Sequence, residues 1–291
     1  MSAKTMKEPN TESSFNQILG RIGFYALIVA IVLFTLFPFY WALNSSFKGE
    51  QELFEPASYL PRSFTMINYQ SVLSNNAFTQ ALFNSAWVSG ATVLLSLIVG
   101  AFAAYALGRL EFKGRTAMMY VVLAMTMFPQ ISILSGLFAI VTEIGVYGSP
   151  LSLILSYPIF TLPFTVWVLT SFFKGLPDEI EQAALVDGAT NFQTFYMIML
   201  PLTAPALVTT GLLAFIAAWN EYLYALTFTL TTPASQTVPV AIAQFSGTVM
   251  RQEPIAEVMA AAMVVTLPLI VLVIVFQKRI VAGLTAGAVK G

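Results

Sequence analysis

The amino-acid sequence predicts an all-α integral membrane protein with six transmembrane helices, both termini in the cytoplasm, and a further helix in the cytoplasmic loop between the fourth and fifth spans. Three observations lead to this prediction. Only 9% of the 291 residues are charged and 57% are hydrophobic, whereas soluble domains carry about 25% charged residues. Six segments are apolar over the roughly 20 residues that a spanning helix needs. The basic residues lie mostly on one side of these segments.

The six predicted spans, in chain order, are Ile22–Leu43, Phe83–Leu107, Ala117–Val141, Leu151–Phe173, Ala204–Leu226 and Val258–Phe276. The first is longer than the apolar part of a cleaved signal peptide and lacks a small-x-small cleavage site, so we expect a retained anchor. The chain then divides into a cytoplasmic N-terminal segment (1–21), a first transmembrane helix with its outer loop (22–82), a core transmembrane domain (83–277) and a cytoplasmic C-terminal tail (278–291).

The orientation follows from the placement of Lys and Arg. Six spans put both termini and the second and fourth loops on one side, which then carries 10 of the 13 basic residues. The other side carries Lys48, Arg62 and Arg251. Because basic residues accumulate on the cytoplasmic side, both termini are predicted to be cytoplasmic.

Several kinds of chemistry are excluded by residues that the sequence lacks. It contains no Cys and no His, which removes thiolate metal sites, Ser-His-Asp catalysis and His proton relays. No GxxxxGK[ST] phosphate-binding loop occurs. We therefore expect a non-catalytic chain with no metal or cofactor of its own.

The second span carries small residues at every fourth position, namely Ser96, Gly100, Ala104 and Gly108. Such a stripe lets another helix approach closely in lipid. The approaching helix can belong to this chain or to a second subunit, and the sequence leaves both interpretations open.

The loop 174–201, KGLPDEIEQAALVDGATNFQTFYMIMLP, predicts two helices separated by a glycine corner. Pro177 and the acids that follow it suit a helix start. Gly188 suits the left-handed residue that ends a helix. Thr190 and Gln193 have the spacing of a capping box, which begins the second helix.

This loop resembles the EAA motif in the permease subunits of ATP-binding cassette (ABC) importers. The EAA, the glycine and the Ile-x-Leu-Pro ending of that motif fall on 182–184, Gly188 and 198–201. Gln182 stands where the motif usually has Glu, so the charge expected to pair with the ATPase comes from Glu181 or Asp187. The resemblance implies a coupling helix that enters a groove of the ATPase subunit and is formed by Glu181, Gln182, Ala183, Ala184, Asp187 and Gly188.

The rest of the chain resembles the carbohydrate-uptake branch of these permeases. The residues that carry this resemblance are Asn84-Ser85, Ala104-Tyr105-Ala106 with Arg109, and Ala218-Trp219-Asn220-Glu221. The closing residues 283–291, GLTAGAVKG, resemble the tail of the second permease subunit of maltose and trehalose importers, which reaches between the ATPase subunits. The resemblance thus assigns an ATPase contact to Thr285, Gly287, Lys290 and Gly291.

The resemblance implies a permease subunit of an ABC sugar importer in a bacterial or archaeal cytoplasmic membrane. Its expected partners are membrane lipid, a homologous permease subunit, two ATPase subunits that hold ATP and Mg²⁺, and an extracytoplasmic sugar-binding protein. No nucleic acid is expected. The expected substrate is an α-glucoside such as maltose or trehalose, moved by alternating access.

Glu221, beside Asn220, is the only carboxylate clearly inside a predicted span. A charge at the bilayer centre costs about 2.5–3.5 kcal/mol on insertion scales, so Glu221 should face protein or water. It either lines the translocation path together with Asn220 or is a buried acid satisfied by neighbouring amides or by the partner permease. In maltose-type relatives the outer loop, here 227–257, contacts the binding protein; its expected tip is Gln244, Phe245, Ser246 and Gly247.

Two other transport functions stay open. One is a secondary transporter driven by an ion gradient, although such proteins often carry inverted repeats and several embedded charges. The sequence has one embedded acid and no obvious repeat. The other is an ABC importer for a different solute. A membrane enzyme is less favoured, because no cluster of acids, nucleophiles or metal ligands is present.

Overall fold

The computed structural model of the chain describes residues 11–53, 55–56, 58–245 and 254–286, with the side chains of 19–278 within these ranges. Every regular element in the described residues is helical. The elements are α1 (Thr11–Ser46), α2 (Glu50–Leu53), α3 (Ile67–Ser74), α4 (Asn76–Arg109), α5 (Arg115–Met125), α6 (Gln130–Glu143), α7 (Pro150–Ser156), α8 (Pro158–Gly175), α9 (Asp178–Val186), α10 (Asn191–Thr194), the π-helix η1 (Phe195–Met199), α11 (Leu200–Leu202), α12 (Ala204–Trp219), α13 (Leu223–Thr229), the 3₁₀-helix η2 (Pro233–Ser235), α14 (Val238–Ala243) and α15 (Ile255–Ala286).

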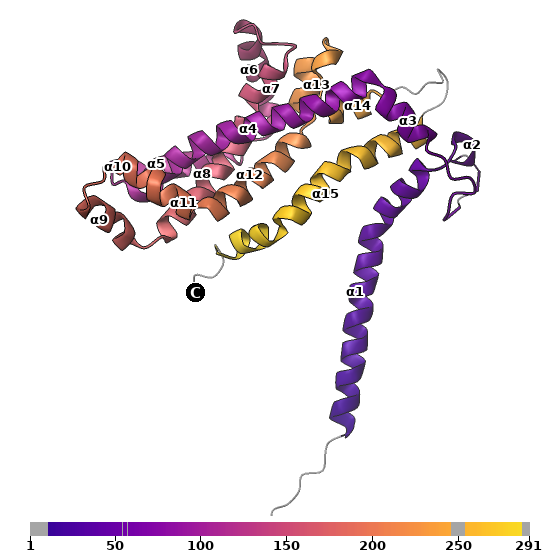
Figure 1. Cartoon of the computed structure of the whole chain (residues 1–291), viewed down its shortest axis with the longest axis horizontal. Coiled ribbons are helices and arrows are strands. Elements are labelled where there is room, and N and C mark those ends of the chain that lie inside the picture. The colour runs from indigo at the N-terminus through magenta and orange to yellow at the C-terminus, as the bar shows by residue number, and fades with distance from the viewer. Residues whose placement is uncertain (1–10, 54, 57, 246–253, 287–291) are drawn as a thin grey trace, which may run out of the picture.

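The bundle is built around α4, which packs against α8 and α12 (Figure 1). The helix α15 packs against α12 and against α1. The short helices α9 and α10 lie at one end of the bundle, and α2 and α3 lie at the other (Figure 1). We call these the α9 end and the α3 end.

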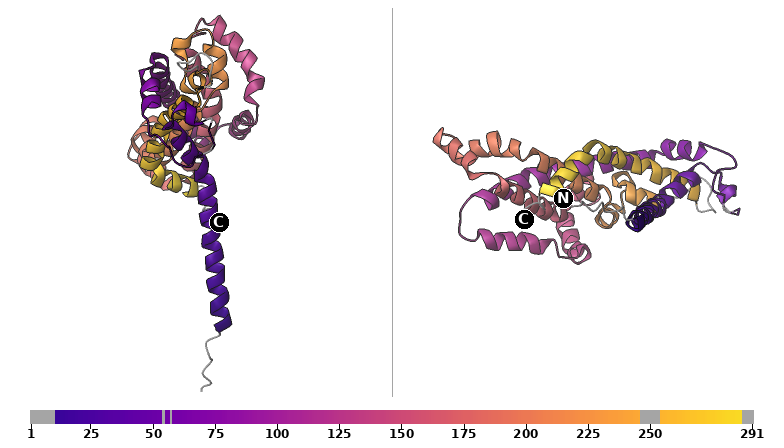
Figure 2. Two further views of the ribbon diagram at one scale, coloured as in Figure 1. Left: turned by 90° about the vertical axis from the view of Figure 1, so that its right-hand side faces the viewer. Right: turned by 90° about the horizontal axis from the view of Figure 1, so that it is seen from below.

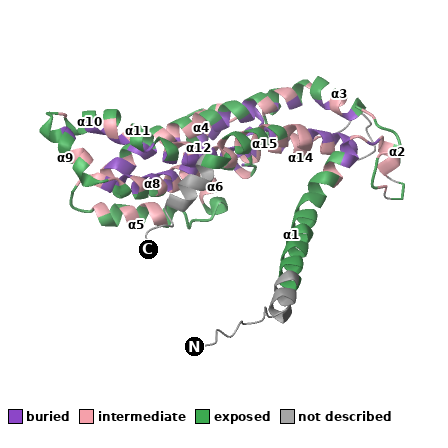
Figure 3. Cartoon of the chain, turned by 60° about the horizontal axis from the view of Figure 1, so that its bottom comes forward, coloured by how far each residue is buried: buried purple, intermediate pink, exposed green. Residues whose placement is uncertain are grey.

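The first helix, α1, diverges from the bundle and meets it at its C-terminal end (Figures 1 and 2). Every side chain from Leu19 to Tyr40 is exposed, and Phe34 is 84% exposed (Figure 3). Within Leu19–Ser46, an 18-residue window reaches a mean hydropathy of 2.5. A helix that is apolar all round needs apolar surroundings, so lipid or another membrane subunit must cover this helix.

Four predicted spans lie in apolar helical segments that are long enough to cross a membrane. These are Leu19–Ser46, Asn76–Arg109, Pro150–Gly175 and Ile255–Lys278. The other two spans are bent, and the total reaches six only if each bent pair counts as one span.

The prediction of a continuous third span over 117–141 is wrong. The helices α5 and α6 meet at 98° across a break after Met125. Pro129 precedes α6 with φ −63° and ψ 129°. A proline disfavours the helical conformation of the residue before it, here Phe128. The helix therefore stops before Pro129 and resumes in a new direction.

The prediction of one helix over 204–226 is also wrong. The helix α12 ends at Trp219, and α13 begins at Leu223. At its other end α12 meets the segment 191–202 at 74°. The break after Trp219 has a local cause, since the Glu221 carboxylate accepts hydrogen bonds from backbone N–H groups of the next helix.

The small residues of α4 face α8 of the same chain, and all four are buried. A Cβ atom on Gly100 would lie 2.7 Å from the Thr165 methyl group, and one on Gly108 would lie 3.0 Å from Phe173 Cβ. The Ser96 and Thr161 hydroxyls are 2.7 Å apart. The stripe therefore packs within this chain, which resolves the alternative left open by the sequence.

The loop after the first span, at the α3 end, includes α2 and α3. Lys48 is only 2% exposed. Its ammonium group donates to the Ser58 carbonyl at 2.6 Å and lies 5.2 Å from the centre of the Trp41 ring. The Asn68 amide donates to the carbonyls of Ser46 (2.9 Å) and Lys48 (2.8 Å). These bonds give the buried Lys48 and Asn68 side chains hydrogen-bond acceptors and tie this loop to α3.

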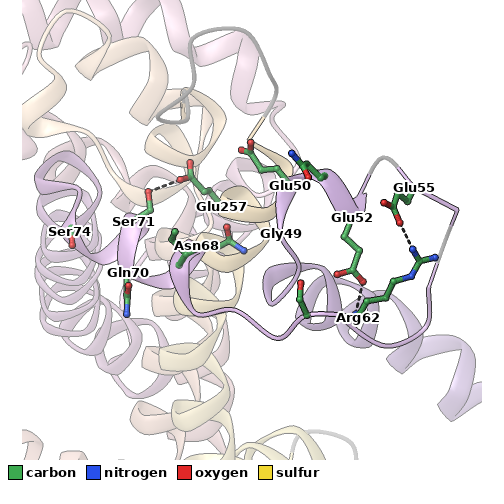
Figure 4. A pocket seen from close by; sticks show the side chains of 13 residues that line it. Gly49, Glu50, Glu52, Glu55, Arg62, Asn68, Gln70, Ser71, Ser74 and Glu257 are labelled. Atoms are coloured by element: carbon green, nitrogen blue, oxygen red, sulfur yellow. Dashed lines mark hydrogen bonds and ion pairs between the residues drawn. The ribbon is translucent and has the colours of Figure 1, made fainter.

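A hollow of about 900 Å³ lies between this loop and the start of α15 (Figure 4). Two of the residues that line the hollow are hydrogen-bonded to each other, since the Ser71 hydroxyl donates to the Glu257 carboxylate at 2.6 Å. On the loop side, the backbone N–H of Arg62 donates to Glu52 at 2.8 Å, and this bond is the main cause that holds the pKa of Glu52 below its usual value. The hollow is lined mostly by polar side chains, including Glu50, Glu55 and Gln70.

Candidate functional site

The two helices predicted from loop 174–201 are present at the α9 end. The helix α9 starts directly after Pro177. It ends at Val186, and Gly188, two residues further on, has a φ of +85°. The N–H of Gly188 donates to the Leu185 carbonyl at 3.1 Å, and the N–H of Ala189 donates to the Ala184 carbonyl at 3.0 Å. This pair of bonds is a Schellman motif, which needs a left-handed residue at the position of the glycine.

The second helix begins with the capping box that the sequence predicts. The Gln193 N–H donates to the Thr190 hydroxyl at 3.2 Å, and the Thr190 N–H donates to the Gln193 side chain at 2.8 Å. Both bonds satisfy donors that a helix start leaves unpaired. Hydrogen bonds between residues close in sequence therefore fix the direction of the chain before and after Gly188.

One side of α9 is bound to the end of α4. The Tyr105 hydroxyl donates to Glu181 at 2.8 Å. The side chain of Arg109 is 5% exposed, and its Nε lies 3.7 Å from the Glu181 carboxylate. The same guanidinium donates to Asp178 and to the Leu176 carbonyl. Glu181 therefore pairs within the chain, and its side chain is 18% exposed.

The opposite side of α9 is exposed, and the side chains at its centre are small or apolar. Ala184 is buried at 4% exposure, whereas Val186 is 86% exposed. Gln182, Ala183, Asp187 and Gly188 are exposed as well. Of the two acids considered for a contact with another subunit, Asp187 is the one that faces outward.

Glu221 lies at the α12–α13 break and is 7% exposed. Its two carboxylate oxygens accept from the backbone N–H groups of Tyr224 (2.8 Å) and Ala225 (3.0 Å). This geometry is that of a helix cap, and it corresponds to the alternative of a buried acid satisfied by amides. Asn220 is exposed, and its amide donates to the Ile216 carbonyl at 2.9 Å. Glu221 is therefore buried within the protein, whereas the neighbouring Asn220 is exposed on its surface.

The expected tip of the outer loop is described only in part. Gln244 follows α14 and accepts from the Gln236 amide at 2.9 Å. Phe245 packs edge-on against Phe78 at 6.5 Å between ring centres. Ser246 and Gly247 lie outside the described residues. Gly287, Lys290 and Gly291 of the tail lie outside them too, and of Thr285 only the backbone is described, as part of α15.

Comparisons with known proteins identify the family. The model of the family "binding-protein-dependent transport system inner membrane component" matches residues 96–285. The trehalose transport permease SugB of Mycobacterium tuberculosis is 41% identical over 93% of this chain and 98% of its own length. The trehalose/maltose transport permease MalG of Thermococcus litoralis is 42% identical over 96% and 99%. The sulfoquinovosyl glycerol transport permease SmoH of Agrobacterium fabrum is 37% identical over 88% and 89%.

Solved structures share the fold at lower identity. A chain of a bacterial ABC transporter that imports alginate matches with a TM-score of 0.74 and 21% identity, over 94% of this chain and 99% of that chain. A chain of the alginate transporter bound to its periplasmic protein matches with a TM-score of 0.65 and 16% identity, over 94% and 96%.

The apolar, partly bent helices and the helical corner at one end define a multi-pass subunit of a membrane transporter. The chain belongs to the family of binding-protein-dependent transport system inner membrane components, and it is a permease subunit of an ABC sugar importer of the carbohydrate branch. The family consists of non-catalytic transport subunits of the inner membrane.

The partners of Glu181 within the chain were not predicted from the sequence. Tyr105 and Arg109 were singled out only for their resemblance to the family, and they lie 76 and 72 positions from Glu181. The spacing of Tyr105 and Arg109 by four residues, which puts both on one helix face at the end of the span, was the available signal.

Proposed function

We propose that the chain forms half of the translocation path for an α-glucoside such as trehalose or maltose, and that the α9 corner couples this path to a separate ATPase subunit. The main observation that supports the proposal is that the two sides of α9 have different surroundings. One side is bound to the spans, and the other presents small and apolar side chains to the surroundings.

The exposed side of α9 has the shape that a groove-binding helix needs. Ala183 lets the partner approach the backbone, and Val186 supplies an apolar side chain at the corner. Exposed acids flank these residues, since Glu179 and Asp187 both face outward. A groove with an apolar floor and basic rims on the ATPase subunit would complement this surface. In this arrangement ATP and Mg²⁺ are bound by the ATPase subunits.

The orientation of the chain supports the same assignment. At the α9 end, Lys113 lies between α4 and α5, Arg115 begins α5 and Lys174 lies in the last turn of α8. Lys48 and Arg62 flank α2 at the α3 end. By the positive-inside rule the α9 end faces the cytoplasm. The α3 end then faces outward, where a sugar-binding protein delivers the substrate.

A second permease subunit is the proposed neighbour of α1. This helix exposes apolar side chains over its whole length from Leu19 to Tyr40, and a homologous subunit would cover one of its faces while lipid covers the rest. The substrate class rests on the relatives, because SugB and MalG carry trehalose or maltose in their names.

The experiment is to purify the tagged chain from its native membrane with its companions and to measure ATP hydrolysis in nanodiscs. The binding protein of the same importer is added with trehalose, maltose or diacetylchitobiose, a β-linked sugar. We expect an ATPase subunit to co-purify and trehalose or maltose to accelerate hydrolysis. Co-purification without an ATPase subunit contradicts the proposed coupling. Acceleration by diacetylchitobiose alone contradicts the proposed substrate class.

A further inference from the structure

The outer end of α4 is bound to the segment that precedes and forms α14. Asn84 is 4% exposed, and its amide donates to the carbonyls of Ala234 (2.8 Å) and Gln236 (2.9 Å). Its side-chain oxygen accepts from Gln80 at 3.0 Å. The donors of this buried amide are therefore both used, and they hold a backbone segment about 150 positions away in sequence. We call this group, together with Ser85, the outer clasp.

Ser85 completes the outer clasp. It is 1% exposed, and its hydroxyl oxygen accepts from the N–H of Val238, the first residue of α14, at 2.8 Å. A buried N–H without an acceptor is costly, so this bond fixes where α14 begins. The residues after α14 are those proposed to contact the binding protein, and Gln244 is tied back to Gln236.

The opposite end of the same helix carries the contacts of Tyr105 and Arg109 with α9, which we call the inner clasp. Both of these side chains are largely buried, with Tyr105 at 6% and the Arg109 side chain at 5% exposure. They hold Glu181 and Asp178 of α9 and the Leu176 carbonyl just before it.

No break separates the two clasps. The helix α4 runs without interruption from Asn76 to Arg109 and contains no proline. The 20 positions from Ser85 to Tyr105 span about 30 Å at 1.5 Å per residue. Between them the buried stripe packs closely on α8, where Ser96 meets Thr161. A continuous helix that is packed along its length moves as one body, whereas the third and fifth spans are bent at breaks.

We propose that α4 is a rigid link that connects the ATPase-facing helix α9 to the outer segment around α14, with Asn84, Ser85, Tyr105 and Arg109 as its positioning residues. This inference rests on the proposed function. Movement of α9 on ATP binding is carried through the inner clasp to α4 and through the outer clasp to α14. Engagement of the binding protein at α14 is carried to the ATPase along the same route in reverse.

The test compares ATP hydrolysis by the complete importer in nanodiscs with and without its binding protein loaded with trehalose or maltose. The measured quantity is the ratio of the two rates. We expect Ser85→Ala and Tyr105→Phe each to lower this ratio about fivefold, which is about 1 kcal/mol of coupling, while the rate without binding protein stays unchanged. Because both clasps lie on one route, the double variant should lose less than the product of the two single losses.

The matched controls remove equivalent groups outside α4. Ser152→Ala removes a buried hydroxyl of α7 that donates to the Ser149 carbonyl at 2.6 Å, and Tyr224→Phe removes a buried tyrosine hydroxyl that donates to the Gln130 carbonyl at 3.0 Å. Both should keep the wild-type ratio. Tyr105→Phe keeps the test decisive if Ser85→Ala lowers the yield of the complex.

The outcomes separate this inference from the proposed function. A wild-type complex whose ATP hydrolysis neither sugar accelerates contradicts the proposed function. Normal acceleration in the wild type together with unchanged ratios in Ser85→Ala and Tyr105→Phe overturns the rigid link alone. Losses that multiply in the double variant, or equal losses in Ser152→Ala and Tyr224→Phe, also overturn it, because they indicate general destabilisation.

Discussion

Replacing Gly188 by valine tests whether the corner after α9 sets the geometry of the coupling surface. Gly188 has φ +85°, and a Cβ atom added there would meet no other heavy atom within 4 Å. The penalty is therefore conformational and not a clash with a neighbour. A left-handed backbone costs a non-glycine residue roughly 1–2 kcal/mol, and a β-branched residue tolerates it least. This energy lowers the equilibrium ratio of native to non-native corner conformations by a factor of about 5–30, which sets the upper bound on the effect.

The assay is a titration of the purified ATPase subunit onto the permease pair in nanodiscs. We expect Gly188→Val to raise the apparent Kd by about 5–30-fold, and Gly188→Asn to stay near wild type because Asn tolerates the left-handed region. Gly145→Val is the matched control, since Gly145 has φ +76° and equally open surroundings in the turn between α6 and α7. An unchanged Kd for Gly188→Val, or an equal rise for Gly145→Val, would refute the reasoning.

Three further predictions concern individual charges. Asp187→Asn should weaken ATPase attachment by no more than about 1 kcal/mol, and less at high salt, because the carboxylate is exposed. Glu181→Gln should instead lower the thermal stability of the permease, because it removes the charge beside Arg109. A larger, salt-sensitive loss of ATPase attachment in Glu181→Gln than in Asp187→Asn would contradict these two assignments. Glu221→Ala should destabilise the chain by about 1–3 kcal/mol in detergent, because it leaves two buried N–H groups without an acceptor; normal stability with lost transport would instead favour a role in the path. In this cysteine-free chain, a cysteine at Arg62 should react with an impermeant thiol reagent in intact cells and one at Lys113 should not, and the reverse pattern would contradict the orientation.

Local chemistry explains which features of the α9 corner could be predicted from the sequence. A capping box, a proline at a helix start and a glycine corner each depend on residues within a few positions, so Thr190, Gln193 and Gly188 could be assigned without a structure. The pairing of Glu181 could not be assigned in this way, because its partners come from another span. The same limit applies to Asn84 and Ser85, whose acceptors and donors lie about 150 positions away.

Hydropathy located the spans but not their breaks. An average over about 20 residues is insensitive to a change of direction inside the window, so 117–141 and 204–226 were predicted as single helices. Pro129 was the local signal for the first break. For the second, the signal was the carboxylate of Glu221 in an otherwise apolar segment, which caps the helix that follows it.

The central claim, that α9 is the ATPase-facing surface, is tested most directly by site-specific cross-linking in the assembled importer. Because the chain contains no cysteine, a photoreactive maleimide can be attached at Val186→Cys on the exposed side of α9 and, in a separate variant, at Ala243→Cys on α14. We predict that the Val186 adduct contains the ATPase subunit and that the Ala243 adduct does not. A Val186 adduct without the ATPase subunit, or an Ala243 adduct with it, would contradict the account.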